Sequence, residues 1–513
     1  MARGHRGFSL VAVASLVLLS IVAVPGQVVH ALGTSGVYVA LAPTRILDTR
    51  DGTGGVPVQP LGQGQTLDVQ VAGAGGVALT ATAAVLNVTV TDTTAQSYLT
   101  VYPSGASRPT ASNLNWVPRQ TIPNLVEVGL GSDGKVTIYN AVGNVDVIFD
   151  VGGYVTVGLP AGEGLYEPLV PARILDTRVG TGVPAGALGP NSTMTLQVAG
   201  QGGVPPTGVS GAVLNVTVTE PTASSYVTVY PSDQSRPVVS NLNFVARQTI
   251  PNRVIVKLSS DGKLSFYNPV GSVQVIADIN GWFTDSSNPI ASGSTFTPLT
   301  PSRILDTRDG SYLLGSGQAM PVPVAGHGGV PAMSDPTPPN AVVANVTVTD
   351  TTTGSYLTAW PDGADRPLAS DLNWNANVTI PNLVVVGLGA DGAIDVYNAA
   401  GCTAVIVDVV GYYSGPVPAP HLGITGGTLC PKPGDNCGAP SNPWGYNFCD
   451  YYSGAYINYP PSNFCSYFAC IPSFWQSTNG WVAECIDTKY SHSGGVSGAC
   501  SSHGGVWRAL WHR

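Results

Sequence analysis

The hexapeptide Arg-Ile-Leu-Asp-Thr-Arg occupies residues 45–50 and returns unchanged at residues 173–178 and 303–308. Further segments recur in register behind each copy. They are Asn-Val-Thr-Val-Thr from Asn87, Asn215 and Asn345, Thr-Ile-Pro-Asn from Thr121, Thr249 and Thr379, and Asp-Gly at Asp133, Asp261 and Asp391. Chance does not produce such a register three times, so the chain contains three copies of one unit.

The pattern within a copy is typical of strands. Residues 83–86 are an apolar run and residues 87–91 alternate, as expected for a strand with one inward face. Asp133-Gly134 between two apolar segments predicts a hairpin, because the turn needs positive φ. No stretch has sustained helical spacing. With roughly eight or nine short strands per copy, we expect an all-β chain in which each copy closes as a two-sheet sandwich.

The repeats set the domain boundaries. We expect three tandem β-sandwich modules followed by a small disulfide-rich C-terminal domain, at residues 36–157, 164–285, 294–415 and, after a linker at 416–427, at 428–513. A unit of this length can close its own core, and the segments between copies are short and rich in Pro, Gly or polar residues. We therefore expect the modules to be separate beads.

The N-terminus has the features of an export signal. Arg3 and Arg6 precede an apolar stretch at residues 8–24, and small residues follow near Ala31. We expect a signal peptide over residues 1–31, a secreted location and no membrane contact after cleavage. An uncleaved membrane anchor is the alternative. The net charge of −9 and the lack of a basic run exclude nucleic acid as an expected partner.

The arginines and aspartates of the repeated hexapeptide admit two interpretations. They could bind an anion, or they could form a structural clasp with the aspartate of the last strand, since arginine pairs bidentately with carboxylates. Three identical copies favour the clasp, because a scaffold requirement recurs more readily than an active site. The clasp residues are Arg45, Asp48 and Asp150, then Arg173, Asp176 and Asp278, then Arg303, Asp306 and Asp408.

Aromatic residues recur with the same spacing and supply the candidate ligand site. Flat aromatic faces stack on sugar rings, although large aromatics usually pack in the core. Tyr98 and Trp116, beside Asn113 and Asn115, are the expected exposed exception. The candidate ligand-binding residues are therefore Tyr98, Trp116, Tyr226, Phe244, Tyr356 and Trp374, together with His503 of the C-terminal segment.

The cysteines concentrate at the C-terminus. An exported segment this small and cysteine-rich predicts disulfides, and the absence of Cys-x-x-Cys disfavours zinc. Cys402 lies in the third copy where the other copies have Asn144 and Ser272, so we expect it to pair with the tail, a free or intermolecular thiol being the alternative. The predicted disulfide cysteines are Cys402, Cys430, Cys437, Cys449, Cys465, Cys470, Cys485 and Cys500.

Two resemblances follow from these motifs. Pro-x-Arg-Ile-Leu-Asp-Thr-Arg, Leu-Asn-Trp, Asp-Gly-x-Val-x-Ile-Tyr-Asn and the closing Val-Ile-x-Asp-Val-x-Gly-Tyr resemble a module repeated in exported actinobacterial surface proteins. Gly-Ala-Cys-Ser-Ser-His-Gly-Gly-Val at residues 498–506 resembles the end of a small secreted bacterial domain of unknown function, although residues 487–489 depart from its usual Asp-Gly. These resemblances imply location and class, and no ligand.

The sequence favours a non-catalytic, secreted or cell-wall-associated binding protein. Its expected partner is wall glycan or another polysaccharide, contacted through the repeats, the tail or both. Repeats that only space and present the tail are one alternative, and a hydrolase acting through the tail is another. No acid pair, Ser-His-Asp set or metal cluster has a recognisable spacing, so we expect no catalytic residues, metal or cofactor. The oligomeric state is left open.

Overall fold

The computed structural model describes residues 34–159, 162–288, 293–310 and 312–415, and in the tail residues 430–431, 440–444, 446, 455–476, 480–485, 487–494, 496, 500–503 and 506–512. The expected signal peptide and the linker at 416–427 lie outside this part of the chain. The all-β class is confirmed, since the described elements are strands apart from two single-turn 3-10 helices. Within the described residues no helix has the length and apolarity needed to span a bilayer.

Each repeat forms eight or nine of the described strands. Repeat 1 contains β1(Val37–Asp48), β2(Thr66–Gln70), β3(Ala83–Thr91), β4(Ser97–Pro103), β5(Leu114–Trp116), β6(Ile122–Gly129), β7(Lys135–Asn140) and β8(Asp146–Thr156). Repeat 2 contains β9(Tyr166–Asp176), β10(Ser192–Gln197), β11(Val209–Thr219), β12(Ser225–Pro231), β13(Leu242–Phe244), β14(Ile250–Lys257), β15(Lys263–Asn268) and β16(Gln274–Thr284). Repeat 3 contains β17(Thr295–Asp306), β18(Tyr312–Leu313), β19(Gln318–Pro323), β20(Pro339–Thr349), β21(Ser355–Pro361), β22(Leu372–Trp374), β23(Ile380–Gly387), β24(Ala393–Asn398) and β25(Ala404–Ser414).

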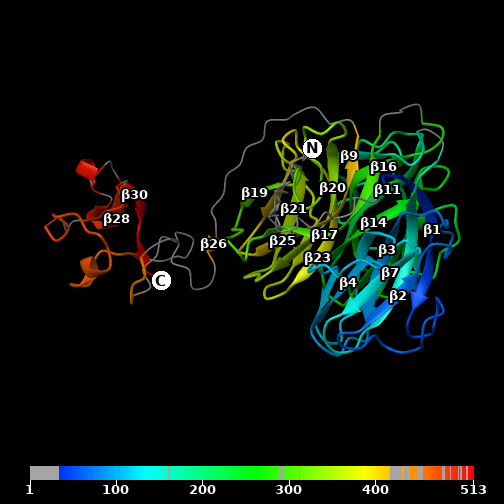
Figure 1. Ribbon diagram of the computed structural model, residues 1–513, viewed down its shortest axis with the longest axis horizontal. Coiled ribbons are helices and arrows are strands. Elements are labelled where there is room, and N and C mark those ends of the chain that lie inside the picture. Colours follow the sequence, from blue (N-terminus) through cyan, green and yellow to red (C-terminus); the bar gives the residue numbers. More distant parts are fainter. Residues whose placement is uncertain are drawn as a thin grey trace, which may run out of the picture.

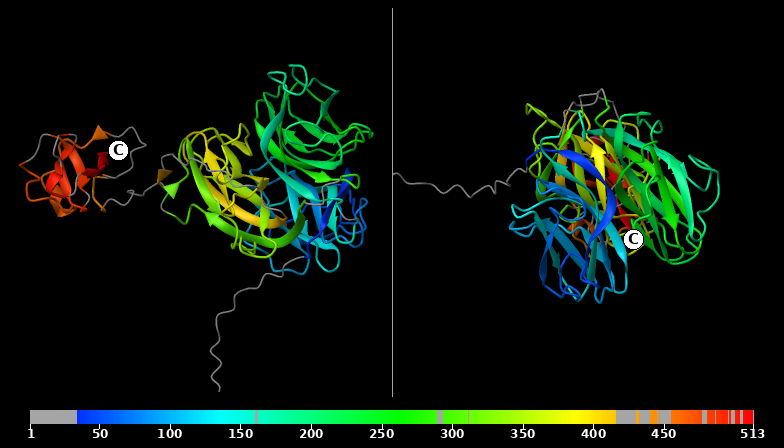
Figure 2. Two further views of the ribbon diagram at one scale, coloured as in Figure 1. Left: turned by 90° about the horizontal axis from the view of Figure 1, so that it is seen from above. Right: turned by 90° about the vertical axis from the view of Figure 1, so that its right-hand side faces the viewer.

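These strands form six four-stranded antiparallel sheets over the described residues, two from each repeat. The inner sheets have the orders β1-β8-β3-β6, β9-β16-β11-β14 and β17-β25-β20-β23. The outer sheets have the orders β2-β7-β4-β5, β10-β15-β12-β13 and β19-β24-β21-β22. The three pairs of sheets lie around a common centre (Figures 1 and 2).

The inner sheets are buried on both faces. In β3, Ala84 and Leu86 belong to a buried cluster formed by residues of repeats 1 and 2, whereas Ala83 and Val85 belong to a second cluster at the centre of the molecule. All three repeats contribute to this second cluster, which includes Tyr166 and Tyr413. The expectation of separate beads is therefore wrong. The apolar run at residues 83–86 reflects burial on two sides, because a strand covered on both faces does not alternate.

A cyclic set of asparagine hydrogen bonds joins the repeats. Asn124 donates to Asn345 of repeat 3, Asn252 donates to Asn87 of repeat 1, and Asn382 donates to Asn215 of repeat 2, at 2.8–3.0 Å. The acceptor asparagines donate in turn to backbone carbonyls of Ser240, Ser370 and Ser112 in the neighbouring repeats. Buried polar groups are costly unless paired, so these bonds fix one angular arrangement of the repeats.

The Asp133-Gly134 turn does not form the expected hairpin. Gly134 has the predicted positive φ of 72°, but the strands on either side belong to different sheets. Strand β6 pairs with β3 in the inner sheet, and β7 pairs with β2 and β4 in the outer sheet. The turn therefore carries the chain from one sheet to the other.

The repeated arginines lie beside the repeated aspartates. Arg45 donates from Nε to Asp150 at 2.9 Å and from Nη1 to Asp48 at 3.3 Å, and Arg50 clamps Asp48 with two further bonds. Repeats 2 and 3 reproduce this geometry with Arg173, Asp176 and Asp278 and with Arg303, Asp306 and Asp408. The hydrogen bond from Arg50 lowers the pKa of Asp48, whereas burial raises the pKa of Asp150 against the opposing effect of Arg45.

The described tail is a small disulfide-linked unit. Its elements are β26(Cys430–Pro431), β27(Ala455–Tyr456), η1(Phe464–Ser466), β28(Trp481–Cys485), β29(Tyr490–Gly494), η2(Ser501–His503), β30(Val506–Ala509) and β31(Trp511–His512). Disulfides join Cys465 to Cys470 and Cys485 to Cys500. These two bridges confirm the expectation that the C-terminal segment contains disulfide bonds. Strand β26 pairs with β18 and so connects the tail to repeat 3 (Figure 1).

Cys402 is also disulfide-bonded, and it packs against Leu313 of β18, the strand that pairs with β26. Its partner is not one of the four cysteines in the two bridges above. Cys437, Cys449 and the side chain of Cys430 lie outside the described residues.

Candidate functional site

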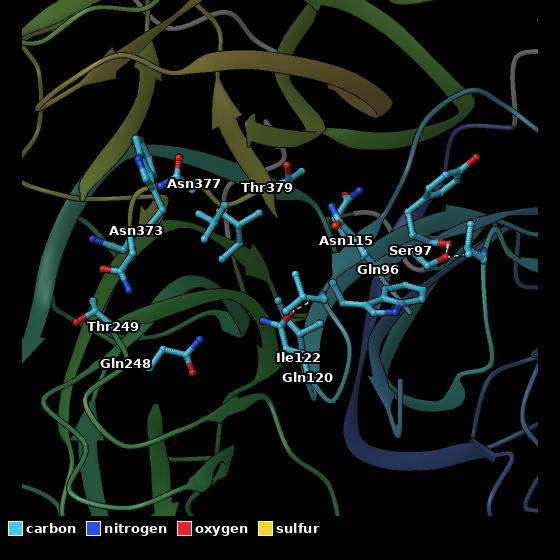
Figure 3. A pocket seen from close by; sticks show the side chains of 18 residues that line it. Gln96, Ser97, Asn115, Gln120, Ile122, Gln248, Thr249, Asn373, Asn377 and Thr379 are labelled. Atoms are coloured by element: carbon cyan, nitrogen blue, oxygen red, sulfur yellow. Dashed lines mark hydrogen bonds between the residues drawn. The ribbon is translucent and has the colours of Figure 1, made fainter. Parts of the chain in front are cut away.

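A chamber of about 590 Å³ lies where the three repeats meet. Repeat 1 supplies Asn115, Gln120 and Ile122, repeat 2 supplies Gln248 and Thr249, and repeat 3 supplies Asn373, Asn377 and Thr379; these side chains surround the opening in Figure 3. The remaining lining residues are Gln96, Ser97, Tyr98, Trp116, Val117, Val142, Trp374, Asn375, Val378 and Ile380.

The ring of repeats builds this chamber from short strands. Strand β5 pairs with β4 at one edge of the outer sheet in repeat 1, and β22 pairs with β21 in repeat 3. Each carries the sequence Leu-Asn-aromatic, so its asparagine projects away from the buried leucine and aromatic ring on either side. The segment that leads into β6 or β23 then adds Gln120 or Asn377.

Four amide side chains of the chamber have occupied oxygens. Asn115 and Asn373 accept hydrogen bonds from Ser112 and Ser370 at 2.9 and 3.0 Å. Gln120 accepts from the backbone N–H of Val117 at 3.1 Å, and the oxygen of Gln248 is occupied in the same way. Their amide nitrogens pair with nothing in the described part of the chain. The chamber therefore offers N–H donors to an entering ligand.

No Asp, Glu, His, Lys or Arg lines the chamber. Tyr98 is the titratable side chain of its lining. Elsewhere in the described residues, no three His, Cys, Asp or Glu side chains converge to hold a metal ion. The chamber combines amides, hydroxyls and aromatic rings, which suits recognition of an uncharged polar ligand.

The structure brings three of the candidate aromatic residues to the chamber and leaves the others away from its lining. Tyr98, Trp116 and Trp374 line it, whereas Tyr226, Phe244 and Tyr356 do not. The expected exposure of Trp116 is wrong, because its side chain packs in the core and is only 3% exposed. Tyr98 is half-buried and is the more accessible ring.

The repeated motifs do not point to the glutamines or to the asparagines of repeat 3 as site residues. Gln120 and Gln248 hold equivalent positions, and Asn375 replaces Val117 and Val245 of the other repeats. The recurrence of glutamine two residues before a buried isoleucine is the signal that could have pointed to them. Their convergence, however, depends on how the repeats are arranged.

His503 lies in the tail, where Nδ1 is 2.6 Å from Asp487 Oδ2. The hydrogen bond from His503 lowers the pKa of Asp487. The neighbouring Cys500 is bonded to Cys485, so it has no thiolate to act as a nucleophile. This pair fits a contact that orders the segment around the disulfide.

The comparisons with known proteins give little beyond this geometry. No family model and no curated protein matches the chain. The atomic structure of Sulfolobus turreted icosahedral virus matches with a TM-score of 0.18 and 11% identity, over 75% of this chain and 92% of that one. The triple jelly roll structure of an archaeal virus turret matches with a TM-score of 0.17 and 12% identity over the same shares. Similarity at this level supports no argument about function.

Proposed function

We propose that this chain is a secreted, non-catalytic glycan-binding protein whose three repeats, each a two-sheet sandwich, share one ligand chamber. The observation that supports the proposal is the lining of the chamber, which has unpaired amide donors and the half-buried ring of Tyr98 but no charged side chain. Sugar hydroxyl and acetamido oxygens accept hydrogen bonds from amides, and the apolar faces of sugar rings pack on aromatic rings. The disulfides and the export-like N-terminus favour a cell-wall glycan as the target.

The test is retention of the mature chain, residues 32–513, on insoluble peptidoglycan, with soluble chitotetraose as competitor. Asn115→Ala and Asn373→Ala together should weaken retention about 30-fold, since each removes a donor worth roughly 1 kcal/mol. Asn243→Ala is the matched control, because Asn243 has the same bond from Ser240 but does not line the chamber. Equal effects of the control and the chamber variants would overturn the proposal.

Two other functions remain as outcomes of the same assay. If the repeats are spacers that present the tail, the wild-type chain will bind neither ligand through the chamber. If the tail is a hydrolase, the chain will release soluble fragments from the polymer, and His503→Ala will abolish that release. The disulfide at Cys500 and the uncharged chamber favour binding over both.

A further inference from the structure

An arginine is stacked on a tyrosine at the same place in every repeat. The guanidinium carbons of Arg108, Arg236 and Arg366 lie 3.9, 3.8 and 3.8 Å from the ring centroids of Tyr139, Tyr267 and Tyr397. A second tyrosine ring flanks each stack, at 6.2, 6.5 and 6.1 Å between centroids; these rings are Tyr98, Tyr226 and Tyr356. We call each group of three side chains an arginine–tyrosine platform.

The outer sheets and one loop build each platform. In repeat 1 the two tyrosines stand on the paired strands β4 and β7, and the arginine lies in the loop between β4 and β5. A proline follows the arginine in all three copies, at residues 109, 237 and 367. Proline restricts the preceding residue to extended conformations, which limits the freedom of the loop where the arginine leaves it.

These arginines differ from the clasp arginines in how their donors are used. Arg45 donates hydrogen bonds to Asp48 and Asp150, and Arg50 donates to Asp48. The side chains of Arg108, Arg236 and Arg366 are exposed and make no hydrogen bond or ion pair with the described part of the chain. The stack orients the guanidinium plane, and its edge keeps the donor fork that recognises carboxylate and phosphate.

We propose that the three platforms bind the carboxylate or phosphate groups of a polyanionic glycan, with the flanking tyrosine packing against the adjoining sugar. Three equivalent sites on one rigid unit suit a polymer with regularly repeated charges, because linked weak contacts raise the effective concentration. The net charge of −9 opposes non-specific electrostatic attraction of polyanions. Binding therefore has to come from the hydrogen bonds and stacking contacts of the platforms. The platform arginines do not line the uncharged chamber, and of the platform residues only Tyr98 belongs to both sites.

The experiment measures affinity of the mature chain for polygalacturonate, which supplies carboxylates, and for poly(glycerol phosphate), which supplies phosphates, with dextran as the neutral polymer. The triple variant Arg108→Ala, Arg236→Ala, Arg366→Ala should lose about 100-fold in affinity for whichever polyanion binds, and each single variant about tenfold or less. Arg→Lys at the three positions keeps the charge but loses the fork and should recover only part of the affinity.

The control for charge is Lys135→Ala, Lys257→Ala, Lys263→Ala, which removes three positive charges from the surface. Lys257 is exposed, whereas Lys135 and Lys263 are half-buried and pair with Asp133 and Asp261. This triple variant should change affinity less than threefold. An equal loss in this control, or wild-type affinity for both polyanions no higher than for dextran, would overturn the proposal. The Asn115→Ala, Asn373→Ala variant should bind polyanions normally, so failure of the chamber and failure of the platforms are distinguishable.

Discussion

At the scale of residues, repeat 2 and repeat 3 each contain one residue that departs from the other copies, and these two residues compensate each other. Arg253 stands where the other repeats have Leu125 and Leu383, and Asp371 stands where they have Asn113 and Asn241. Arg253 Nη2 donates to Asp371 Oδ1 at 2.5 Å, and both side chains are buried. The second oxygen of Asp371 accepts the N–H of Ala359, as the asparagines do for Val101 and Val229. This ion pair distinguishes the interface between repeats 2 and 3 from the other two interfaces between repeats.

Asp371→Asn alone should lower the free energy of unfolding by about 3–5 kcal/mol, because it leaves the buried Arg253 without a counterion. Arg253→Leu combined with Asp371→Asn recreates the leucine and asparagine of the other two interfaces. The double variant should return to within about 1 kcal/mol of the parent, as judged by urea unfolding. A double variant as unstable as Asp371→Asn would contradict this account of the pair.

Glu127 is a second residue that breaks the threefold pattern, since its counterparts are Ile255 and Val385. It is buried at the centre, where Tyr413 donates to Oε1 at 3.2 Å and Oε2 has no partner in the described part of the chain. Burial raises the pKa of Glu127 to about 8, and the hydrogen bond from Tyr413 opposes this only in part. The protonated carboxyl is therefore the form that the folded state favours.

A pKa raised by folding gives a defined pH dependence. The contribution of protonated Glu127 is fully present below the unfolded pKa of about 4.3 and is lost as the pH rises toward the folded value near 8. Glu127→Gln should remove this loss, so its stability relative to the parent should rise by on the order of 4 kcal/mol between pH 4 and pH 8. Urea unfolding at several pH values measures it, and a pH-independent difference would show that Glu127 does not titrate in this window.

Comparison of the three copies could locate such residues from the sequence. It identifies Cys402 as a cysteine that the other copies lack, and the same comparison singles out Glu127, Arg253 and Asp371. That Arg253 faces Asp371 could not be predicted in this way, because the two residues meet only across an interface between repeats.

At the scale of elements, the sequence of β3 indicates both that the segment is a strand and that both of its faces are buried. Alternation at residues 87–91 correctly indicates a strand, and all nine residues of β3 are buried. The apolar run at residues 83–86, which precedes the alternating segment, reflects burial of the second face of the strand. A sheet packed on one side only would expose every second residue to water. The sequence thus predicts the strands. It does not predict what covers the second face, because that partner belongs to the other copies of the repeat.

The clasp gives an element-scale prediction for repeat 3. Arg303→Met should lower the free energy of unfolding by about 3 kcal/mol, since it leaves Asp408 buried and unpaired beneath β17. Arg308→Met is the control within the same hexapeptide. Arg308 is 44% exposed, and Asp306 keeps its bonds from Arg303 Nη1 and from the backbone N–H of residue 308 when the Arg308 side chain is lost, so this variant should cost about 1 kcal/mol. Thermal unfolding compares the two variants, and equal losses would contradict the clasp.

At the scale of the whole molecule, the three copies form one closed ring. The number of copies and their all-β nature follow from the repeated motifs, but their mutual packing does not. Asn87 and Asn124 are ordinary strand residues in the sequence, and only in the ring do they bond to other repeats. The chamber could not be predicted for the same reason, because its lining is drawn from all three copies.

The most direct test of this account is the molar mass of the mature chain after cleavage between its repeats. Protease sites inserted within residues 158–162 and 286–292 allow both connections to be cut, and light scattering during size-exclusion chromatography then reports the mass of the particle. We predict a single particle with the mass of the uncut chain, because the shared core and the asparagine bonds hold the repeats together. Separation into folded, independent fragments would contradict the closed ring and the chamber built from it.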